Sequence, residues 1–394
     1  MMSKKTRKIC VVINNRANYA RIKYFLKFAK KIKNIDLHII VGASANLDRY
    51  GDLNKVIKKD GFTTKYKIST IVEGENPIAM AKSTALSIIE LSSIFERIKP
   101  HIVLTVADRF ETLATAIAST YQNIFLAHTQ GGEVSGSIDE SVRHSITKLA
   151  HIHFPSTKRS KKFLLKLGEN KKHVFLTGCP SIDILKNEKL ELSKKLINKI
   201  NSTKTNGVID FKKNYVILMQ HPVTTEYLDS KRQIKETIKS VKALLSKGIQ
   251  IVWLWPNIDA GSDIFSKEIR KFRELNKNLK NILFYKNFSP EEYATILNNC
   301  SCIFGNSSSG IREASYLGIP AVNIGNRQRN REIAKNVVNV KYLSKDIVKA
   351  VLKQFNKRFK KNNLYGDGKA GEKIAQILST CDLDIVKKLN YIKN

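Results

Sequence analysis

Acidic side chains gather in two segments of the first half of the chain. Asp108 follows an apolar run at 102–106, and Glu133 and Asp139 lie in the glycine-containing segment 128–144. Clustered carboxylates suit general acid and base catalysis, because like charges and partial burial separate their pKa values. Loop capping and surface charge would explain the same residues without chemistry, and their spacing is no metal-binding signature.

Arginine and histidine side chains also lie near these carboxylates or shortly after apolar runs. Arg109 and Arg143 lie close in sequence to these carboxylates. In the second half, His221 comes two residues after an apolar run at 215–219, where it would meet a ligand rather than the core. Asn257 likewise follows an apolar run. These positions extend the hypothesis of a polar site to both halves of the chain.

A loop rich in small residues indicates a phosphate-binding site in the second half. The apolar run 300–304 is followed by GNSSSG (305–310) and then by a helical pattern. Backbone N–H groups and the dipole at a helix N-terminus attract phosphate, although simple N-capping by serine would also explain the sequence. Arg327 follows the next apolar run and can pair with phosphate oxygens. Glu313, early in the helix, can accept hydrogen bonds from ribose hydroxyls.

The secondary-structure elements that must position these residues alternate regularly along the chain. Short apolar runs, the predicted strands, are 8–13, 37–41, 102–106, 124–128, 151–154 and 174–177, and then 215–219, 249–255, 282–285, 300–304 and 321–324. Helical patterns such as 21–33, 79–99 and 111–120 lie between them. This alternation predicts an α/β fold with two doubly wound parallel sheets, which bind ligands beyond the carboxyl ends of their strands.

The alternation of predicted strands and helices stops at 187–213, a polar, lysine-rich stretch. We therefore predict a first Rossmann-like domain at 1–188 and a second at 189–370. A helical pattern at about 371–389 predicts a C-terminal helix within 371–394. A chain of 394 residues fits two domains, because a domain usually holds about 100–200 residues.

The net charge of +35 is the most unusual property of the composition. Lysines lie along the whole chain and form no single stripe interleaved with aromatic residues. We therefore attribute the charge to frequent use of lysine as a surface residue rather than to a nucleic-acid site. Such a field still attracts an anionic nucleotide. The five cysteines are scattered, and no apolar run reaches the roughly 18–20 residues of a membrane span. We expect a cytoplasmic protein that binds neither nucleic acid nor membrane.

Several motifs together resemble one family. They are RANYAR (16–21), ADRFETLA (107–114), GGEVSGSIDESVRHSITKLAHIH (131–153), QHPVTTE (220–226), PNIDAGS (256–262), GNSSSGIRE (305–313) and IGNRQ (324–328). In this order they resemble the hydrolysing UDP-N-acetylglucosamine 2-epimerases, which make N-acetylmannosamine for sialic-acid-like sugars. The resemblance implies a GT-B-like fold with an interdomain active-site cleft. It also implies elimination of the nucleotide through a 2-acetamidoglucal, followed by addition of water, without a cofactor or a metal.

The resemblance also implies roles for individual residues. Asp108, Asp139 and His221 are the acid/base candidates, with Arg109 and Arg143 as supporting charges. The residues implied to hold the nucleotide are Arg16, Asn257, Lys286, Ser307, Ser308, Glu313 and Arg327. We further expect a homodimer or homotetramer that binds a nucleotide-sugar substrate.

Two positions depart from the family pattern. Asn18 and Gln130 stand where family members commonly or in some cases carry an acid. Either Glu133 takes over part of the acid/base work, or the substrate and the order of steps differ. A GDP-linked sugar and a diacetamido sugar leading to legionaminic acid remain open as substrates. The competing functions are a non-hydrolysing 2-epimerase, a GT-B glycosyltransferase, an inactive sugar-nucleotide sensor and a basic nucleic-acid-binding module.

Overall fold

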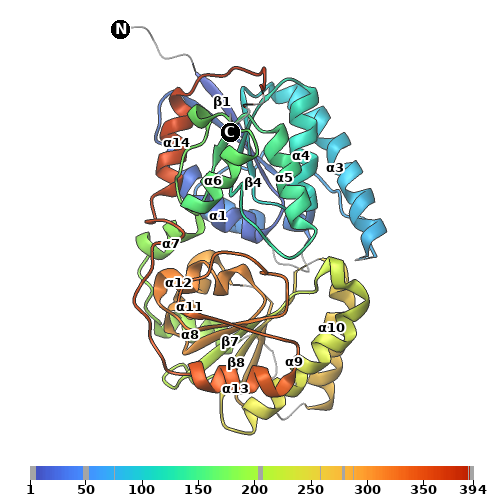
Figure 1. Cartoon of the computed structure of the whole chain (residues 1–394), viewed down its shortest axis with the longest axis vertical. Helices are drawn as coiled ribbons and strands as arrows, with labels where there is room; N and C mark the ends of the chain where they lie inside the picture. Colours follow the sequence, from blue (N-terminus) through green and yellow to red (C-terminus); the bar gives the residue numbers. More distant parts are fainter. Residues whose placement is uncertain are drawn as a thin grey trace.

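The computed structural model describes residues 6–47, 53–74, 76–202, 207–257, 259–276, 280–286, 288–388 and 390. These residues form two six-stranded parallel sheets, one in each half of an elongated molecule (Figure 1). The first sheet has the order β3-β2-β1-β4-β5-β6. Its strands are β1 (Arg7–Ile13), β2 (Ile35–Val41), β3 (Tyr66–Lys67), β4 (Ile102–Val106), β5 (Phe125–Thr129) and β6 (Ile152–Phe154). The second sheet repeats this pattern.

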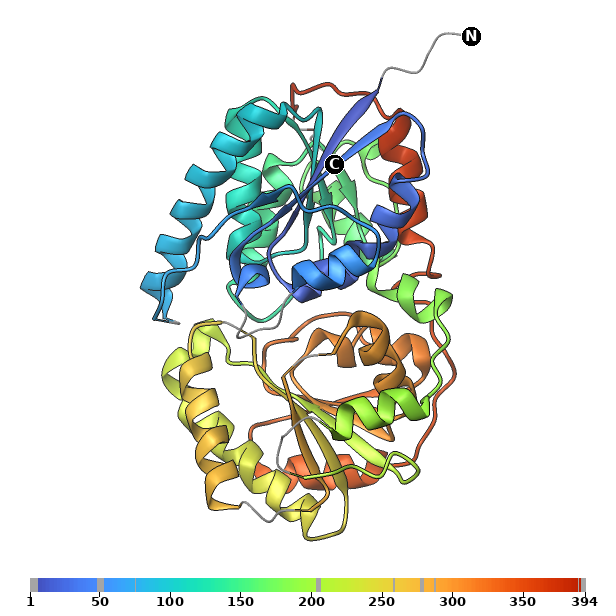
Figure 2. The same cartoon turned by 180° about the vertical axis from the view of Figure 1, so that it is seen from behind.

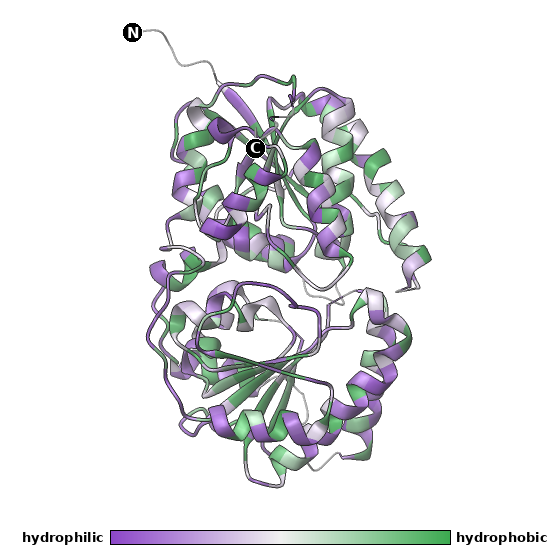
Figure 3. Cartoon of the chain, viewed as in Figure 1, coloured by the Kyte–Doolittle hydropathy of each residue, from purple (hydrophilic) through white to green (hydrophobic). Residues whose placement is uncertain are grey.

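The second sheet has the order β12-β11-β10-β7-β8-β9. Its strands are β7 (Tyr215–Met219), β8 (Gln250–Leu254), β9 (Ile282–Tyr285), β10 (Cys302–Gly305), β11 (Ala321–Ile324) and β12 (Val337–Val340). Its central strands are almost wholly hydrophobic, whereas the surrounding helices alternate hydrophilic and hydrophobic residues (Figure 3). This pattern is typical of strands that are covered on both faces. The predicted α/β fold with two Rossmann-like sheets is therefore confirmed.

Helices cover both faces of each sheet (Figure 2). In the first half they are α1 (Arg16–Ala29), α2 (Leu53–Lys59), α3 (Pro77–Ile98), α4 (Phe110–Tyr121), α5 (Asp139–Leu149), α6 (Lys158–Lys166) and α7 (Ser181–Asn187). The remaining helices are α8 (Lys194–Asn201), α9 (Ser230–Leu245), α10 (Ser262–Leu275), α11 (Pro290–Asn299), α12 (Glu313–Leu317), α13 (Ser344–Gln354) and α14 (Ala370–Thr380). Short 3₁₀ turns are η1 (Ala43–Asn46), η3 (Lys171–His173), η4 (Thr224–Asp229) and η5 (Ser308–Gly310).

The C-terminal helix α14 returns to the first half of the molecule and lies against α1 (Figure 1). Its residues Ile374, Ala375 and Leu378 are fully buried in the same apolar core as strand β1. The chain therefore crosses between the halves twice. The domain boundaries at 188 and 370 stay predictions.

Several details differ from the sequence-based expectations. The predicted strand at 174–177 is wrong, because only Val174 pairs, in an isolated bridge with His153. The edge strands β3 and β12 escaped prediction; β3 has only two residues, and β12 carries exposed asparagine and valine side chains. Helix α1 begins at Arg16, not at residue 21, because the side chain of Asn15 caps its first turn.

The predicted helix at 371–389 is also too long, since α14 ends at Thr380. Beyond it, the carboxylates of Asp382 and Asp384 accept hydrogen bonds from nearby backbone N–H groups. Such local bonds compete with helix formation. Lys387 then donates to two backbone carbonyls of the first half. The tail is therefore held by contacts with the first sheet's helices rather than by helical hydrogen bonds.

Among the described residues, one helix, α3, is long and apolar enough to cross a membrane by length and composition alone. It packs along α4 at the side of the first sheet, and a third of its most apolar window is buried there. Length and composition do not separate such a helix from one that covers a sheet.

Candidate active site

The carboxyl ends of the strands in the two sheets face one another across a cavity of about 820 Å³. It is lined by predicted site residues from the first half, namely Arg16, Asp108, Arg109 and Asp139. The second half contributes His221, Asn257, Lys286, Ser307, Ser308, Glu313 and Arg327. Two predicted residues, Glu133 and Arg143, do not line the cavity; they lie directly behind its wall.

Strand register explains why these residues meet. The last residues of the neighbouring strands β4 and β5, Val106 and Thr129, are paired, so the loops that follow them leave the sheet side by side. In the second sheet Gly305 at the end of β10 pairs with Met219 of β7. Gly305 has a φ of +129°, and a Cβ atom there would lie 2.1 Å from the carbonyl oxygen of Met219. Only glycine allows this close turn into the serine loop.

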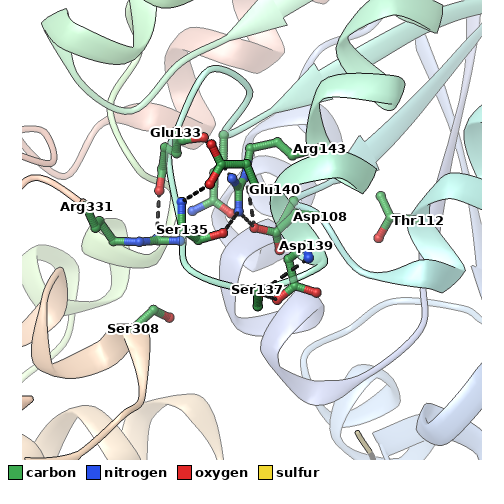
Figure 4. A network of polar contacts seen from close by, with 12 residues as sticks. Asp108, Thr112, Glu133, Ser135, Ser137, Asp139, Glu140, Arg143, Ser308 and Arg331 are labelled. Atoms are coloured by element: carbon green, nitrogen blue, oxygen red, sulfur yellow. Dashed lines mark hydrogen bonds and ion pairs between the residues drawn. The ribbon is translucent and has the colours of Figure 1, made fainter. Parts of the chain in front are cut away.

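Asp108 forms an ion pair with Arg143 (Figure 4). Nε of Arg143 lies 3.1 Å from Oδ2 of Asp108, and a second guanidinium nitrogen also donates to this oxygen. Burial alone would raise the pKa of Asp108, but Arg143 and Arg21 lower it well below its usual range. Asp108 is therefore a fixed negative charge at neutral pH.

Asp139, the first residue of α5, has a different environment. Oγ of Ser137 donates to its Oδ2 at 3.0 Å. Partial burial and the negative charge of Asp108 raise the pKa of Asp139 to about 6, although Arg327 and Arg109 oppose the shift. A carboxyl group with this pKa can exchange a proton near neutral pH. The pKa values of the two carboxyl groups are therefore shifted in opposite directions.

Three hydrogen bonds hold His221 in place. Asn306 accepts a hydrogen bond from its backbone N–H and donates one to its carbonyl, both at 2.7 Å. Its Nδ1 accepts from the backbone N–H of Asn257 at 3.0 Å. Burial and the charge of Arg327 lower the pKa of His221 to about 3. The ring is therefore neutral and carries its proton on Nε2, so it can donate a hydrogen bond but is a poor base.

Asp259 was missed in the sequence, although it stands two residues after Asn257. Its Oδ1 accepts from Nη1 of Arg109 at 2.5 Å, and its Oδ2 lies 3.9 Å from Arg327. Arg109 comes from the first half and Asp259 from the second. This carboxylate therefore joins the halves and holds both arginines at the cavity.

The serine loop combines capping with ligand-facing groups. Oγ of Ser307 accepts from the backbone N–H of Ser309 at 3.3 Å, so part of its role is the expected N-cap. Ser308 and Glu313 face the cavity. Oε2 of Glu313 is buried and has no hydrogen-bond partner among the described residues. A buried acceptor beside a cavity is suited to a hydroxyl group of a ligand.

Five further arginines line the cavity and were not predicted as site residues: Arg21, Arg270, Arg273, Arg312 and Arg331. Arg21 and Arg312 belong to the motifs RANYAR and SGIRE, so motif membership was the available signal. The cavity has more guanidinium groups than carboxylates on its wall. Such an excess favours an anionic ligand. Among the described residues, no group of three or more His, Cys, Asp or Glu side chains could hold a metal ion.

Comparison with known proteins assigns the family. The sequence profile described as UDP-N-acetylglucosamine 2-epimerase matches residues 28–379. A protein of Legionella pneumophila named UDP-N,N'-diacetylbacillosamine 2-epimerase (hydrolyzing) is 34% identical to this chain and covers 98% of it and 99% of its own length. The chain belongs to the UDP-N-acetylglucosamine 2-epimerase family.

Other members of the family agree with this assignment. A Campylobacter jejuni protein named GDP/UDP-N,N'-diacetylbacillosamine 2-epimerase (hydrolyzing) is 31% identical over 90% of this chain and 89% of its own. The structure of the Neisseria meningitidis UDP-GlcNAc 2-epimerase bound to UDP-GlcNAc covers 94% of this chain and 99% of its own, with a TM-score of 0.76 and 20% identity. The Methanocaldococcus jannaschii enzyme in complex with UDP-GlcNAc and UDP has the same coverage, a TM-score of 0.78 and 22% identity. These two structures support the GT-B-like fold.

In this 2-epimerase family member, the two departures from the family pattern lie behind the cavity wall. Gln130 is buried, and its Nε2 donates to Sγ of Cys179 at 2.9 Å. Oδ1 of Asn18 accepts from the backbone N–H of Asn14 at 3.3 Å. Neither side chain lines the cavity. Both amides are thus held by neighbouring groups of the first half.

Glu133 does not occupy the position expected of a substitute acid. Its carboxylate is buried behind the cavity and paired with Arg312 and Arg331. Burial alone would raise the pKa of Glu133, but these arginines lower it to about 2. A carboxylate that stays ionised and has no access to the cavity is unsuited to proton exchange with a ligand. The acid/base role of Glu133 stays a prediction from the sequence, and the contacts of its carboxylate connect the two halves of the molecule.

Proposed function

We propose that this family member is a hydrolysing nucleotide-sugar 2-epimerase whose substrate is a UDP-linked 2-acetamido sugar. The observation that carries the proposal is the cavity itself. It combines a titratable Asp139, a fixed carboxylate and a neutral histidine with an arginine-rich wall and a serine loop. The names of the Legionella and Campylobacter relatives favour N,N'-diacetylbacillosamine as the sugar, with N-acetylglucosamine as the second candidate.

In the proposed reaction, the carboxylate of Asp139 removes the proton from C2 of the sugar. The bond between C1 and the diphosphate oxygen breaks, so that UDP leaves and a C1–C2 double bond forms. Water then supplies a hydroxyl group to C1, and C2 receives a proton on the opposite face. The products are UDP and a free sugar with inverted configuration at C2. Nε2–H of His221 and the nearby arginines stabilise the negative charge that develops on the leaving diphosphate.

Product analysis tests this function. The purified protein is incubated separately with UDP-N,N'-diacetylbacillosamine and UDP-N-acetylglucosamine, and the products are identified by ¹H and ³¹P NMR. We expect free UDP and a free manno-configured sugar in equal amounts. Accumulation of a UDP-linked C2 epimer would show a non-hydrolysing enzyme, and dependence of UDP release on an added acceptor would show a glycosyltransferase. The homodimer or homotetramer and the cytoplasmic location stay predictions from the sequence.

The nucleotide site makes a prediction of its own. Arg327 lines the cavity beside the serine loop, and its Nη1 lies 3.4 Å from the carbonyl oxygen of Asn306. We expect Arg327→Ala to weaken UDP binding about tenfold or more, because a charge-assisted bond contributes roughly 1.5–3 kcal/mol. Calorimetric titration with UDP measures the effect. Arg329→Ala is the matched control, since Arg329 is exposed and lies outside the cavity wall.

Two results decide this placement. Arg329→Ala should bind UDP like the wild type. An Arg327→Ala variant that is folded and keeps wild-type affinity would contradict the assignment of Arg327 to the diphosphate.

A further inference from the structure

The segment 133–137, here called the bridging segment, connects the two halves beside the cavity (Figure 4). It leaves β5 of the first sheet and touches the loop after β11 of the second. The backbone N–H of Gly136 donates to the carbonyl of Arg327 at 3.2 Å. A Cβ atom at Gly136 would lie 1.9 Å from the carbonyl oxygen of Asn326. The two backbones are therefore in direct contact, at the loop that carries the proposed diphosphate ligand.

The side chain of Glu133 adds a buried ion-pair cluster to this contact. Its Oε2 accepts from Nη2 of Arg312 at 2.5 Å and from Nη1 of Arg331 at 2.7 Å. All three side chains are at most 5% exposed. Glu133 belongs to the first half and both arginines to the second. One carboxylate oxygen thus joins the acid-bearing loop to two sides of the proposed nucleotide site.

The backbone of Glu133 contacts the first half of the molecule, whereas its side chain contacts the second. The carbonyl oxygen of Glu133 accepts from Nη1 of Arg143 at 2.7 Å, and Oγ of Ser135 accepts from Nη2 of Arg143 at 3.1 Å. Arg143 in turn holds Asp108. A continuous chain of charged hydrogen bonds therefore runs from Arg312 and Arg331 through the bridging segment to Asp108, the charge beside Asp139.

The buried ion-pair cluster carries more positive than negative charge. One carboxylate faces two buried guanidinium groups, and both arginines also line the cavity. Burial and, after it, the positive charge of Arg312 lower the pKa of Arg331 to about 10, and the negative charge of Glu133 opposes this shift. Loss of the carboxylate would leave two positive groups without their partner at the cavity wall. An anionic diphosphate would then be attracted at least as strongly as before.

We propose that Glu133 is a positioning residue, which fixes Asp108 and Arg143 in the first half relative to the nucleotide-binding loops of the second half and exchanges no proton itself. Its effect on rate rests on the proposed 2-epimerase function. Its effect on nucleotide binding does not. The residue therefore differs in its expected kinetic signature both from an acid or base and from a ligand of the diphosphate.

The test compares Glu133→Gln with the wild type. We expect kcat for the UDP-sugar to fall about 10²-fold, because small displacements of reacting groups can cost this factor. The Kd of UDP, measured by calorimetry, should be unchanged or lower. A kcat within threefold of the wild type would overturn the proposal, and so would a loss of UDP affinity that parallels the loss of kcat. Failure of the wild-type enzyme to turn over would refute the proposed function instead, while the UDP comparison would still test this residue.

A second variant separates positioning from simple charge burial. Glu133→Asp keeps the negative charge of the cluster but shortens the side chain by one methylene group, and it leaves both arginines in place. If Glu133 only neutralises buried charge, this variant should keep wild-type kcat, which would overturn the proposal. If it positions Asp108 and Arg143, kcat should fall about 10²-fold in a protein with near wild-type thermal stability. Glu133→Asp also provides the measurement should Glu133→Gln fail to fold.

Glu291→Gln is the matched control. Glu291, at the start of α11, pairs with the buried Lys23 of α1 and so forms another ion pair between the halves. Its side chain does not line the cavity, and among the described residues it forms no hydrogen bond or ion pair with Asp108 or Arg143. We expect its kcat to remain near the wild-type value. A loss equal to that of Glu133→Gln would show that any weakened contact between the halves slows the reaction, which would overturn a specific positioning role.

Discussion

Replacing Asp139 with asparagine is expected to lower kcat by about 10²–10⁴-fold, the usual contribution of a positioned acid or base. Asp139 lines the cavity, and its pKa is raised to about 6 by partial burial and by the charge of Asp108. Asparagine keeps the shape of the side chain but cannot take up a proton. Steady-state kinetics with the UDP-sugar measures the loss, and UDP binding should be retained because Asp139 is not assigned to the diphosphate.

The matched control is Glu140→Gln, one residue further along α5. Glu140 accepts from the backbone N–H of Ser135 at 3.0 Å and lies outside the cavity wall. It should keep most of the activity. A base with a pKa of about 6 works only when deprotonated, so wild-type kcat should fall as the pH decreases through 6. An Asp139→Asn variant that retains both its activity and this acidic limb would show that another group removes the proton.

Asp108 is a less direct probe, although it lies beside Asp139. Its carboxylate is the partner of the fully buried Arg143. Asp108→Asn would leave that guanidinium without its counter-charge, and breaking a buried pair by removing one partner is strongly destabilising, at roughly 3–5 kcal/mol. A loss of activity in that variant would therefore mix chemistry with unfolding.

His221→Ala is expected to lower kcat about 10²–10³-fold, the effect of removing one preorganised hydrogen-bond donor. The neutral ring donates through Nε2, since Nδ1 is occupied by the backbone N–H of Asn257. The donor acts on charge that develops on the leaving diphosphate, so UDP affinity should change much less than kcat. Kinetics and calorimetry on the same preparation measure the two effects.

His221→Gln is the informative companion variant. A glutamine side-chain amide can donate from nearly the position of Nε2, so this variant should recover part of the activity that alanine loses. If glutamine is as inactive as alanine and the wild-type rate follows the titration of a histidine near its ordinary pKa, then His221 acts as an acid or base and the donor role is contradicted.

Most residues of the candidate site could be predicted because parallel strands bring their carboxyl ends together. Asp108, His221 and Ser307 each follow a strand that was recognised from its apolar run, and the register of the sheets then places them at one cavity. The family assignment could also be reached from the motifs. Arg327 was predicted from the same rule of strand ends, because it follows strand β11.

Contacts between the halves could not be predicted in this way. Whether Glu133 faces a ligand or Arg312 and Arg331 depends on residues about 180–200 positions away. Arg109 pairs locally with Glu111, but its partner across the halves, Asp259, is 150 positions away. Local spacing contains no information about such pairs. The C-terminal helix was overextended for a similar reason, because the segment after Thr380 is held by distant contacts, such as the bonds from the Lys387 side chain to the carbonyls of residues 147 and 150.

The central claim is a hydrolytic epimerisation that removes and returns the proton at C2, and turnover in D₂O tests it most directly. The wild-type protein is incubated with the UDP-sugar that it consumes, and the released sugar is examined by ¹H NMR and mass spectrometry. We expect a free manno-configured sugar that carries one solvent deuterium at C2, together with UDP. A released sugar that keeps its original proton and configuration at C2 would show simple hydrolysis and contradict the mechanism proposed for Asp139.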